Sequence, residues 1–364
     1  MCILIEKKGV DPDMRMKDLG FYRGVNLGGW FSQCNHTEER YNNFILEKDF
    51  KTISDWQLDH VRLPIDYNLI ESEDGKKIES GYEHINRAIE WCKKYNLNLI
   101  LDLHKTPGFS FDKGEKEIGF FDDEELQERF FNIWENLASH FANAFEDSPS
   151  GRKKEICFEL LNEVTEKSFS KKWNSIAKKC IERIRIIAPK TKILVGSYWN
   201  NSLAAVKDLD CPYDENIVYN FHCYEPLVFT HQGAQWIEKM PVDFRFPLKS
   251  KFSDYIKMTE EKCGQTGTSF ENLPSNATVD ENYFETIFAE ALKIAKDRGV
   301  LLYCGEYGVI DTADKNDTLE WYHLISSIFN KYGIGRAAWS FKQMNFGLSD
   351  SRLDDVRQQL NKYL

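Results

Sequence analysis

The chain has 364 residues, 42% hydrophobic and 29% charged, a balance typical of a folded globular protein with a sizeable core and not of a disordered one. Its 58 acidic residues against 47 Lys and Arg give a net charge of −11, which repels phosphate backbones and argues against a nucleic-acid partner. The nine cysteines are odd in number and contain no C-x-x-C pair, which argues against a disulfide framework and a zinc site.

The N-terminal stretch, residues 1–18, contains only a four-residue apolar run before Glu6, too short for the core of a signal peptide. No later run approaches the length that spans a membrane. We therefore expect a monomer without a signal peptide or a membrane partner. It would be cytoplasmic as written, or secreted if a leader precedes the given sequence.

Short apolar runs alternate along the chain with segments of helical spacing. Eight runs are candidate strands: 21–27, 59–65, 97–104, 155–163, 192–197, 216–224, 300–306 and 335–341. Four of the segments between them place apolar residues on one helical face: 81–96, 123–145, 170–188 and 280–299, the last with Gly299 as a stop. Strand followed by helix, eight times, predicts an α/β fold, a single (β/α)₈ barrel domain over residues 1–364.

One interval between the predicted strands is too long for a single crossover helix, because 82 residues separate Tyr224 from Glu306. The earlier part of this interval, residues 239–258, is rich in aromatics, and the later part, residues 262–282, is polar with Gly and Pro. We therefore predict an inserted subdomain or lid after strand six, at about residues 239–282.

Polar side chains recur where the predicted strands end, and in a barrel these ends open onto the face that carries the active site. The residues are Arg62, Asp102, His104, Asn162, Glu163, His222, Tyr224, Glu306 and, in the last strand, Trp339. One such residue would carry no weight, but this many predict a catalytic constellation.

Taken singly, each has a structural explanation: either glutamate could be an exposed loop acid, and either histidine a hydrogen-bonded core residue. Glu159 shares the pleat side of Glu163 but lies roughly 13 Å before it along a strand, so we expect it low in the barrel and structural. Asn162 points away from Glu163 on strict alternation. It reaches the site only if the strand ends or bulges there.

Metal chemistry is the main competing interpretation, with Asp102, His104, His222 and the glutamates as ligands. The H-x-H pair of many metal hydrolases is absent, and the strand at 192–197 ends without His, Lys or carboxylate. We therefore predict no metal and no other cofactor.

The motifs around the predicted strand ends together resemble those of a known family. HVRLP (60–64), LDLH (101–104), LLNE (160–163), NFHCYEP (220–226) with FTHQ (229–232), and YCGEYG (303–308) together resemble glycoside hydrolase family 5, most of all its bacterial cellulases. The resemblance runs from about Arg23 to Phe341. It implies that Glu163 is the acid/base and Glu306 the nucleophile of a retaining glycosidase.

Supporting roles follow from this resemblance and from charge. Arg62 would keep Glu306 ionised, and Tyr224 would hydrogen-bond it. Asn162 would bind the sugar 2-hydroxyl, whose contacts strengthen in the transition state. The remaining predicted contacts are His104 and His222 to hydroxyls and carboxyls, Trp339 to a sugar face, and Trp199, Trp236 and His231 on the leaving-group side.

The resulting prediction is a retaining endo-β-1,4-glucanase that hydrolyses cellulose-type or mixed-linkage β-glucan, as polysaccharide or oligosaccharide. A β-1,3-glucanase or β-mannanase of the same family is the alternative within the class. A non-catalytic sugar-binding barrel is the alternative outside it, disfavoured by the presence of both carboxylates.

Overall fold

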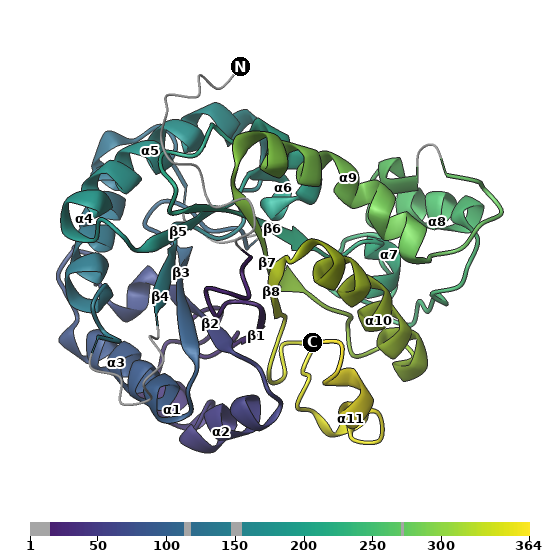
Figure 1. Ribbon diagram of the computed structural model, residues 1–364, viewed down its shortest axis with the longest axis horizontal. Helices are drawn as coiled ribbons and strands as arrows, with labels where there is room; N and C mark the ends of the chain where they lie inside the picture. The colour runs from purple at the N-terminus through teal and green to yellow at the C-terminus, as the bar shows by residue number, and fades with distance from the viewer. Residues whose placement is uncertain (1–14, 113–117, 147–154, 271–272) are drawn as a thin grey trace.

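The computed structural model describes residues 15–112, 118–146, 155–270 and 273–364. Eight parallel strands form a closed barrel in which each strand pairs with the next and the last pairs with the first (Figure 1). They are β1 (Arg23–Asn26), β2 (His60–Asp66), β3 (Asn98–Lys105), β4 (Ile156–Glu159), β5 (Lys192–Val195), β6 (Ile217–Cys223), β7 (Leu301–Tyr307) and β8 (Gly335–Ala338). Each overlaps a predicted strand, and the (β/α)₈ prediction is confirmed.

The four helices predicted from apolar spacing all form, and they cover the outside of the barrel (Figure 1). They are α3 (Glu79–Lys94), α4 (Glu124–Phe141), α5 (Ser170–Ile187) and α9 (Glu281–Arg298). Asp123 and Asp280 cap the first turns of α4 and α9 through their carboxylates. Gly299 ends α9 with φ 61°, a left-handed conformation that favours glycine.

Shorter helices lie in the connections, and one long helix precedes the last strand. The short helices in the connections are α1 (Glu38–Asn43), α2 (Glu47–Asp55) and α6 (Tyr198–Asn201), and a further short helix, α11 (Arg357–Leu360), follows the barrel. The long helix before the last strand is α10 (Lys315–Tyr332). No helix in the described ranges combines the length and apolar character that crossing a bilayer requires.

The barrel interior is built in layers, because alternate residues of each strand point inward. Its floor is a separate apolar cluster of buried residues: Met16, Phe21, Ile100, Cys157, Leu194, Val218, Tyr303 and Ala337. Two residues further along the strands, the inward positions become polar: Arg62, Asp102, Glu159 and Asn220 are all buried and joined by hydrogen bonds or ion pairs. The change from apolar to polar occurs toward the C-terminal ends of the strands.

The long interval between β6 and α9 contains short helices beside the barrel: α7 (Leu227–Thr230) and α8 (Phe252–Met258), with a π-helical turn at Thr259–Cys263. Figure 1 shows α7 and α8 on the same side of the barrel as α9 and α10. The Leu248 amide donates to Asp317 Oδ2 of α10 at 3.0 Å, and Phe252 packs on Tyr283 of α9 at 5.7 Å between ring centroids. The segment predicted as an insertion is thus attached to two barrel helices.

Candidate active site

Arg62 is the centre of the site. The sequence analysis counted it among the residues at the strand ends, but it lies in the middle of β2, and its inward position buries it completely. Its Nε and Nη2 donate to the two oxygens of Glu159 at 2.7 and 2.8 Å, and Nη1 donates to Glu306 Oε1 at 2.9 Å. Nη2 also lies 3.0 Å from Asp102 Oδ2. One guanidinium therefore organises three carboxylates.

Glu159 is one of these three, and its place differs from the prediction. We expected it low in the barrel, but apolar side chains occupy the floor and Glu159 lies in the next layer, against Arg62. Asn220 Nδ2 donates to Glu159 Oε1 at 2.8 Å. Glu159 is thus buried and structural, as predicted, and it supports the group that contacts Glu306.

Glu306 is held in the barrel mouth by contacts from two further residues of the β6 segment. A register shift between β6 and β7 brings His222 opposite Glu306. The Tyr224 hydroxyl donates to Glu306 Oε2 at 2.9 Å, and His222 Nδ1 lies 3.6 Å from the same oxygen. Burial raises the pKa of Glu306, while His222 and the Arg62 guanidinium act in the opposite direction.

Glu163 reaches the site because β4 ends early. The strand stops at Glu159, and Glu163 adopts φ 22°, so strict alternation no longer applies. Asn162 was predicted to reach the site only if the strand ends before it, and it does: its Oδ1 accepts a hydrogen bond from Arg62 Nη2 at 2.9 Å. His222 Nδ1 lies 2.8 Å from Glu163 Oε1, and burial raises the pKa of Glu163.

The two glutamates are close neighbours with different surroundings. A carboxylate oxygen of Glu163 and one of Glu306 lie within 4.8 Å of each other. Arg62 donates directly to Glu306, whereas the Glu163 carboxylate contacts the imidazole of His222 and an amide. A pair of carboxyl groups in unlike environments can divide acid and nucleophile roles between them.

Two buried nitrogen atoms point to the ligand chemistry. His104 Nε2 and Asn162 Nδ2 have no hydrogen-bond partner among the described residues, although both side chains are buried. His104 Nδ1 hydrogen-bonds Asp102 Oδ2 at 2.6 Å, and burial lowers the pKa of His104. An unsatisfied buried polar group costs about 1–3 kcal/mol. Hydroxyl groups of a bound molecule would satisfy both.

Aromatic side chains line the rest of the site. Trp339 directly follows β8 and is 7% exposed, and its ring is parallel to that of His104 with centroids 5.8 Å apart. Trp199 and Trp236 are 52% and 47% exposed, as expected for side chains that could meet a ligand. Phe346 lies 6.4 Å from Trp236 between ring centroids, and the sequence analysis missed it because its loop carries no strand or helix pattern.

His231 lies beside two aromatic residues of the barrel mouth. It is buried, with its ring 4.9 Å from that of Tyr224 and 5.9 Å from that of Trp236. Burial lowers the pKa of His231 to about 3, so the ring stays neutral. His231 therefore packs between these two aromatic residues and supports them.

Asn26 is a further residue that the sequence analysis missed. Its Oδ1 accepts from Arg62 Nη1 at 2.8 Å, and its Nδ2 donates to the carbonyl of Gly305, next to Glu306, at 2.9 Å. Asn26 is the last residue of β1, so the strand-end rule applied to the first strand would have found it.

Glu163, His222 and Glu306 are also the one group of described residues whose ligand atoms lie close enough together to hold a metal ion. Their chemistry does not fit that use. The Arg62 guanidinium is 2.9 Å from Glu306, and His222 Nδ1 is already bonded to Glu163. A cation here would compete with a buried positive charge.

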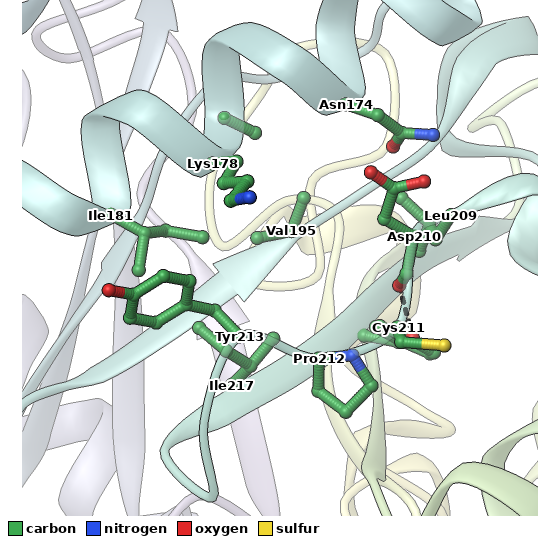
Figure 2. A pocket seen from close by; sticks show the side chains of 12 residues that line it. Asn174, Lys178, Ile181, Val195, Leu209, Asp210, Cys211, Pro212, Tyr213 and Ile217 are labelled. Carbon is green, nitrogen blue, oxygen red and sulfur yellow. Dashed lines mark hydrogen bonds between the residues drawn. The ribbon is translucent and has the colours of Figure 1, made fainter. Parts of the chain in front are cut away.

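A hollow of about 400 Å³ lies elsewhere, on the outer wall of the barrel between α5 and residues 209–213 (Figure 2). Figure 2 shows Ile181, Val195, Leu209 and Ile217 around it, with Lys178 and Asp210 as charged neighbours. It contains none of the predicted site residues. The barrel mouth remains the candidate active site.

Comparisons with known proteins show the family of the chain and its fold. Residues 23–345 match the model of the family described as cellulase (glycosyl hydrolase family 5). The chain is 47% identical over 321 residues to cellodextrinase A of Ruminococcus flavefaciens, covering 88% of this chain and 85% of that protein. It is 37% identical to endoglucanase C of Acetivibrio thermocellus, covering 94% and 97%. The crystal structure of endoglucanase Cel5A from Thermotoga maritima shares the fold, with a TM-score of 0.72, 23% identity and coverage of 98% and 100%.

Proposed function

The chain belongs to glycoside hydrolase family 5 and is a β-glucanase, and from this premise we propose a retaining endo-β-1,4-glucanase acting on cellulose-type or mixed-linkage β-glucan. The observation that supports retention is the close approach of the two residues, since one carboxylate oxygen of Glu163 and one of Glu306 lie within 4.8 Å of each other. Retaining enzymes place their carboxyl groups about 5–5.5 Å apart and inverting ones about 6.5–9.5 Å. Proton NMR of the first product tests this: a β-anomer is expected, and an α-anomer would exclude retention.

In the proposed first step, Glu306 attacks the anomeric carbon while Glu163 gives its proton to the departing glycosidic oxygen. The bond to the leaving sugar breaks and a glycosyl ester with Glu306 forms. In the second step a water molecule attacks the same carbon, Glu163 takes its proton, and Glu306 leaves as the carboxylate.

Unlike surroundings suit the two carboxylates to these roles. Arg62 and Tyr224 each donate to Glu306, which favours its ionised form. The Glu163 carboxylate instead contacts the amide of Asn200 and the imidazole of His222, and burial raises its pKa so that it can hold a proton. The separation of roles is the one expected when two carboxyl groups perform acid and nucleophilic chemistry together.

Substrate binding would use the polar and aromatic atoms left open in the barrel mouth. We propose that Asn162 Nδ2 donates to the sugar 2-hydroxyl and His104 Nε2 to a neighbouring hydroxyl, because both atoms lack a partner among the described residues. Trp339 supplies an apolar surface for a pyranose face. Trp199 and Trp236, both exposed, would stack on sugars of the leaving-group side.

A preference for short cello-oligosaccharides is a second candidate within this activity, because the relative with 47% identity is named a cellodextrinase. Assays on β-1,4-glucan, mixed-linkage glucan, laminarin and mannan, with sizing of products over time, separate the possibilities. Random internal cleavage supports the endo assignment, whereas laminarin as the best substrate would replace it by a β-1,3-glucanase.

Arg62→Met is expected to shift the acidic limb of the pH–activity profile to higher pH. Activity needs Glu306 ionised, and removing the adjacent positive charge raises the pKa of Glu306, so more alkaline conditions are required. The variant also leaves Asp102 and Glu159 buried without their cation, a loss of about 3–5 kcal/mol of folding stability.

Arg62→Lys provides the comparison for that variant, because lysine keeps the charge but not the planar fork. Its acidic limb should move less than that of Arg62→Met. An acidic limb at the same pH in a folded Arg62→Met enzyme would show that the charge does not act on the nucleophile.

Replacing residues 239–279 by a short Gly/Ser linker should weaken polymer hydrolysis more than hydrolysis of a short aryl cellobioside. Only the polymer is long enough to use a wall beside the cleft, so its kcat/KM should fall by roughly tenfold or more, equivalent to about 1.4 kcal/mol of lost binding. The design keeps Asp280, which caps α9.

Thermal unfolding checks that the shortened enzyme remains folded, since the deletion removes Phe252 and Phe270 from the surface of Tyr283. Equal loss of activity on both substrates in a folded enzyme would mean that the segment carries part of the catalytic site.

A further inference from the structure

The segment after β5 has an unusual backbone. Trp199, Asn200 and Asn201 have φ values of 51°, 56° and 55°, so three consecutive residues other than glycine are left-handed. Side chains with a Cβ disfavour this region, and Asn is among the residue types that tolerate it best. Such a run persists only when its surroundings hold it, and it is typical of functional sites.

This left-handed turn is bonded to the chain immediately after Glu163. The amide of Trp199 donates to the carbonyl of Thr165 at 3.2 Å, and the amide of Asn200 donates to the carbonyl of Val164 at 3.0 Å. Glu163 itself has φ 22°, outside the regular strand conformation. The turn thus holds the backbone of residues 164–165, directly after Glu163, through two hydrogen bonds.

Its side chains contact both oxygens of the Glu163 carboxylate, one directly and one through a histidine. Asn200 Nδ2 donates to Glu163 Oε2 at 2.9 Å. Asn201 Nδ2 lies 3.4 Å from His222 Nε2, and Nδ1 of the same ring lies 2.8 Å from Glu163 Oε1. Burial lowers the pKa of His222 to about 4, in agreement with a neutral ring.

We propose that Asn200 is a positioning residue of the hydrolytic reaction, which orients the Glu163 carboxyl and favours its ionised form by donating to Oε2. The inference rests on the proposed function of Glu163 as the acid/base. Burial raises the pKa of Glu163, and the hydrogen bond from Asn200 is the largest opposing influence. An acid/base must both release and recover a proton, so neither form can be favoured too strongly.

The other groups that act on Glu163 come from different strands. His222 of β6 bonds Oε1. The groups that act on Glu163 electrostatically are Arg62 of β2, Asp102 and His104 of β3, Tyr224 after β6 and Glu306 of β7. Asn200 is neutral and follows β5, so changing it leaves the charge of all these groups intact.

The test is the pH dependence of kcat/KM for Asn200→Ala and Asn200→Asp on a soluble β-1,4-glucan. Without the donor the pKa of Glu163 rises, so it stays protonated to higher pH and the alkaline limb should move up by about one pH unit in Asn200→Ala. Asn200→Asp keeps the shape but brings a negative charge close to Glu163, and its limb should move further. An unmoved alkaline limb would overturn the proposal.

Two substrates separate positioning from a general structural effect. On the glucan, whose leaving group needs a proton, kcat/KM near neutral pH should fall about tenfold or more in Asn200→Ala. On a 2,4-dinitrophenyl cellobioside, whose leaving group needs none, it should stay within about twofold of the parent enzyme. Equal losses on both substrates would mean that Asn200 only maintains the fold.

Asn42→Ala is the matched control, because Asn42 Nδ2 also donates to a glutamate, Glu38 Oε2, at 3.1 Å on the exposed surface of α1. Asn42→Ala should leave the pH dependence of kcat/KM on the glucan unchanged. Adding Asn200→Ala to Glu163→Gln should cost little further activity, since the group on which Asn200 acts is then absent. Robust glucan hydrolysis by Glu163→Gln would overturn the proposed function itself, whereas an inactive Glu163→Gln with an unmoved limb in Asn200→Ala overturns this inference alone.

Discussion

Glu306→Gln is expected to lose turnover of every substrate by about 10⁶-fold, the scale on which removing a covalent nucleophile acts in other hydrolases. The amide keeps the shape of the side chain but is a far weaker nucleophile, so the glycosyl ester cannot form. Leaving-group quality should not matter. A 2-deoxy-2-fluoro cellobioside with an activated leaving group should add the mass of one fluorocellobiosyl group, a disaccharide, to the parent enzyme in a mass spectrum and nothing to Glu306→Gln.

Glu71→Gln is the control for this variant, because Glu71 is also a shielded carboxylate, bonded by Arg129 Nη2 at 2.6 Å, but lies outside the site. It should retain full activity. If Glu306→Gln hydrolysed glucan at more than a trace of the parent rate, another residue would have to be the nucleophile.

Glu163→Gln is expected to lose polymer hydrolysis by about 10²–10⁴-fold, the usual contribution of general acid–base catalysis. Its effect should depend on the substrate. A 2,4-dinitrophenyl cellobioside needs no acid for its first step, so the glycosyl ester should form at nearly the parent rate and then accumulate. In a time course of dinitrophenol release we expect a rapid burst followed by slow turnover.

Azide distinguishes this role from others, because an anionic nucleophile needs no general base. Added azide should restore turnover of the aryl glycoside by Glu163→Gln and yield a β-glycosyl azide. Azide should have no such effect on Glu306→Gln. A Glu163→Gln enzyme without a burst, or one that azide leaves slow, would remove Glu163 from the acid/base role.

The barrel could be predicted because its signal is local. Strands buried on both faces are short, nearly continuous apolar runs, and the helices between them keep an apolar face. The ends of the elements were harder to place. The predicted strand at 155–163 ends at Glu159, since the chain beyond it turns to bring Glu163 to the barrel mouth.

The residue types of the site could also be predicted, because parallel strands deliver their last side chains to one face. The depth at which each side chain lies within the barrel was harder to predict from the sequence. Arg62 lies inside β2, and Glu159 lies directly against it. The lowest layer of the barrel interior is the apolar floor, which includes Met16 and Phe21, two residues outside the strands. Residues from before the barrel thus decide at which layer the polar network begins.

The sequence by itself determined the strand–helix repeat, the barrel and the two glutamates with their motifs, because these depend on residue type and short-range spacing. Tertiary structure alone decided that Glu163 and Glu306 approach within 4.8 Å, that Arg62 bonds only the second of them, and that Asn200 reaches the first. The Arg62–Glu306 bond joins two strands that are far apart in the chain. The positions of Glu163 and Asn200 depend on loops held by distant contacts, such as the left-handed turn at 199–201 bonded to residues 164–165. Two of its three residues are asparagines, which tolerate the left-handed region, but the contacts that hold the turn in place come from residues distant in the sequence.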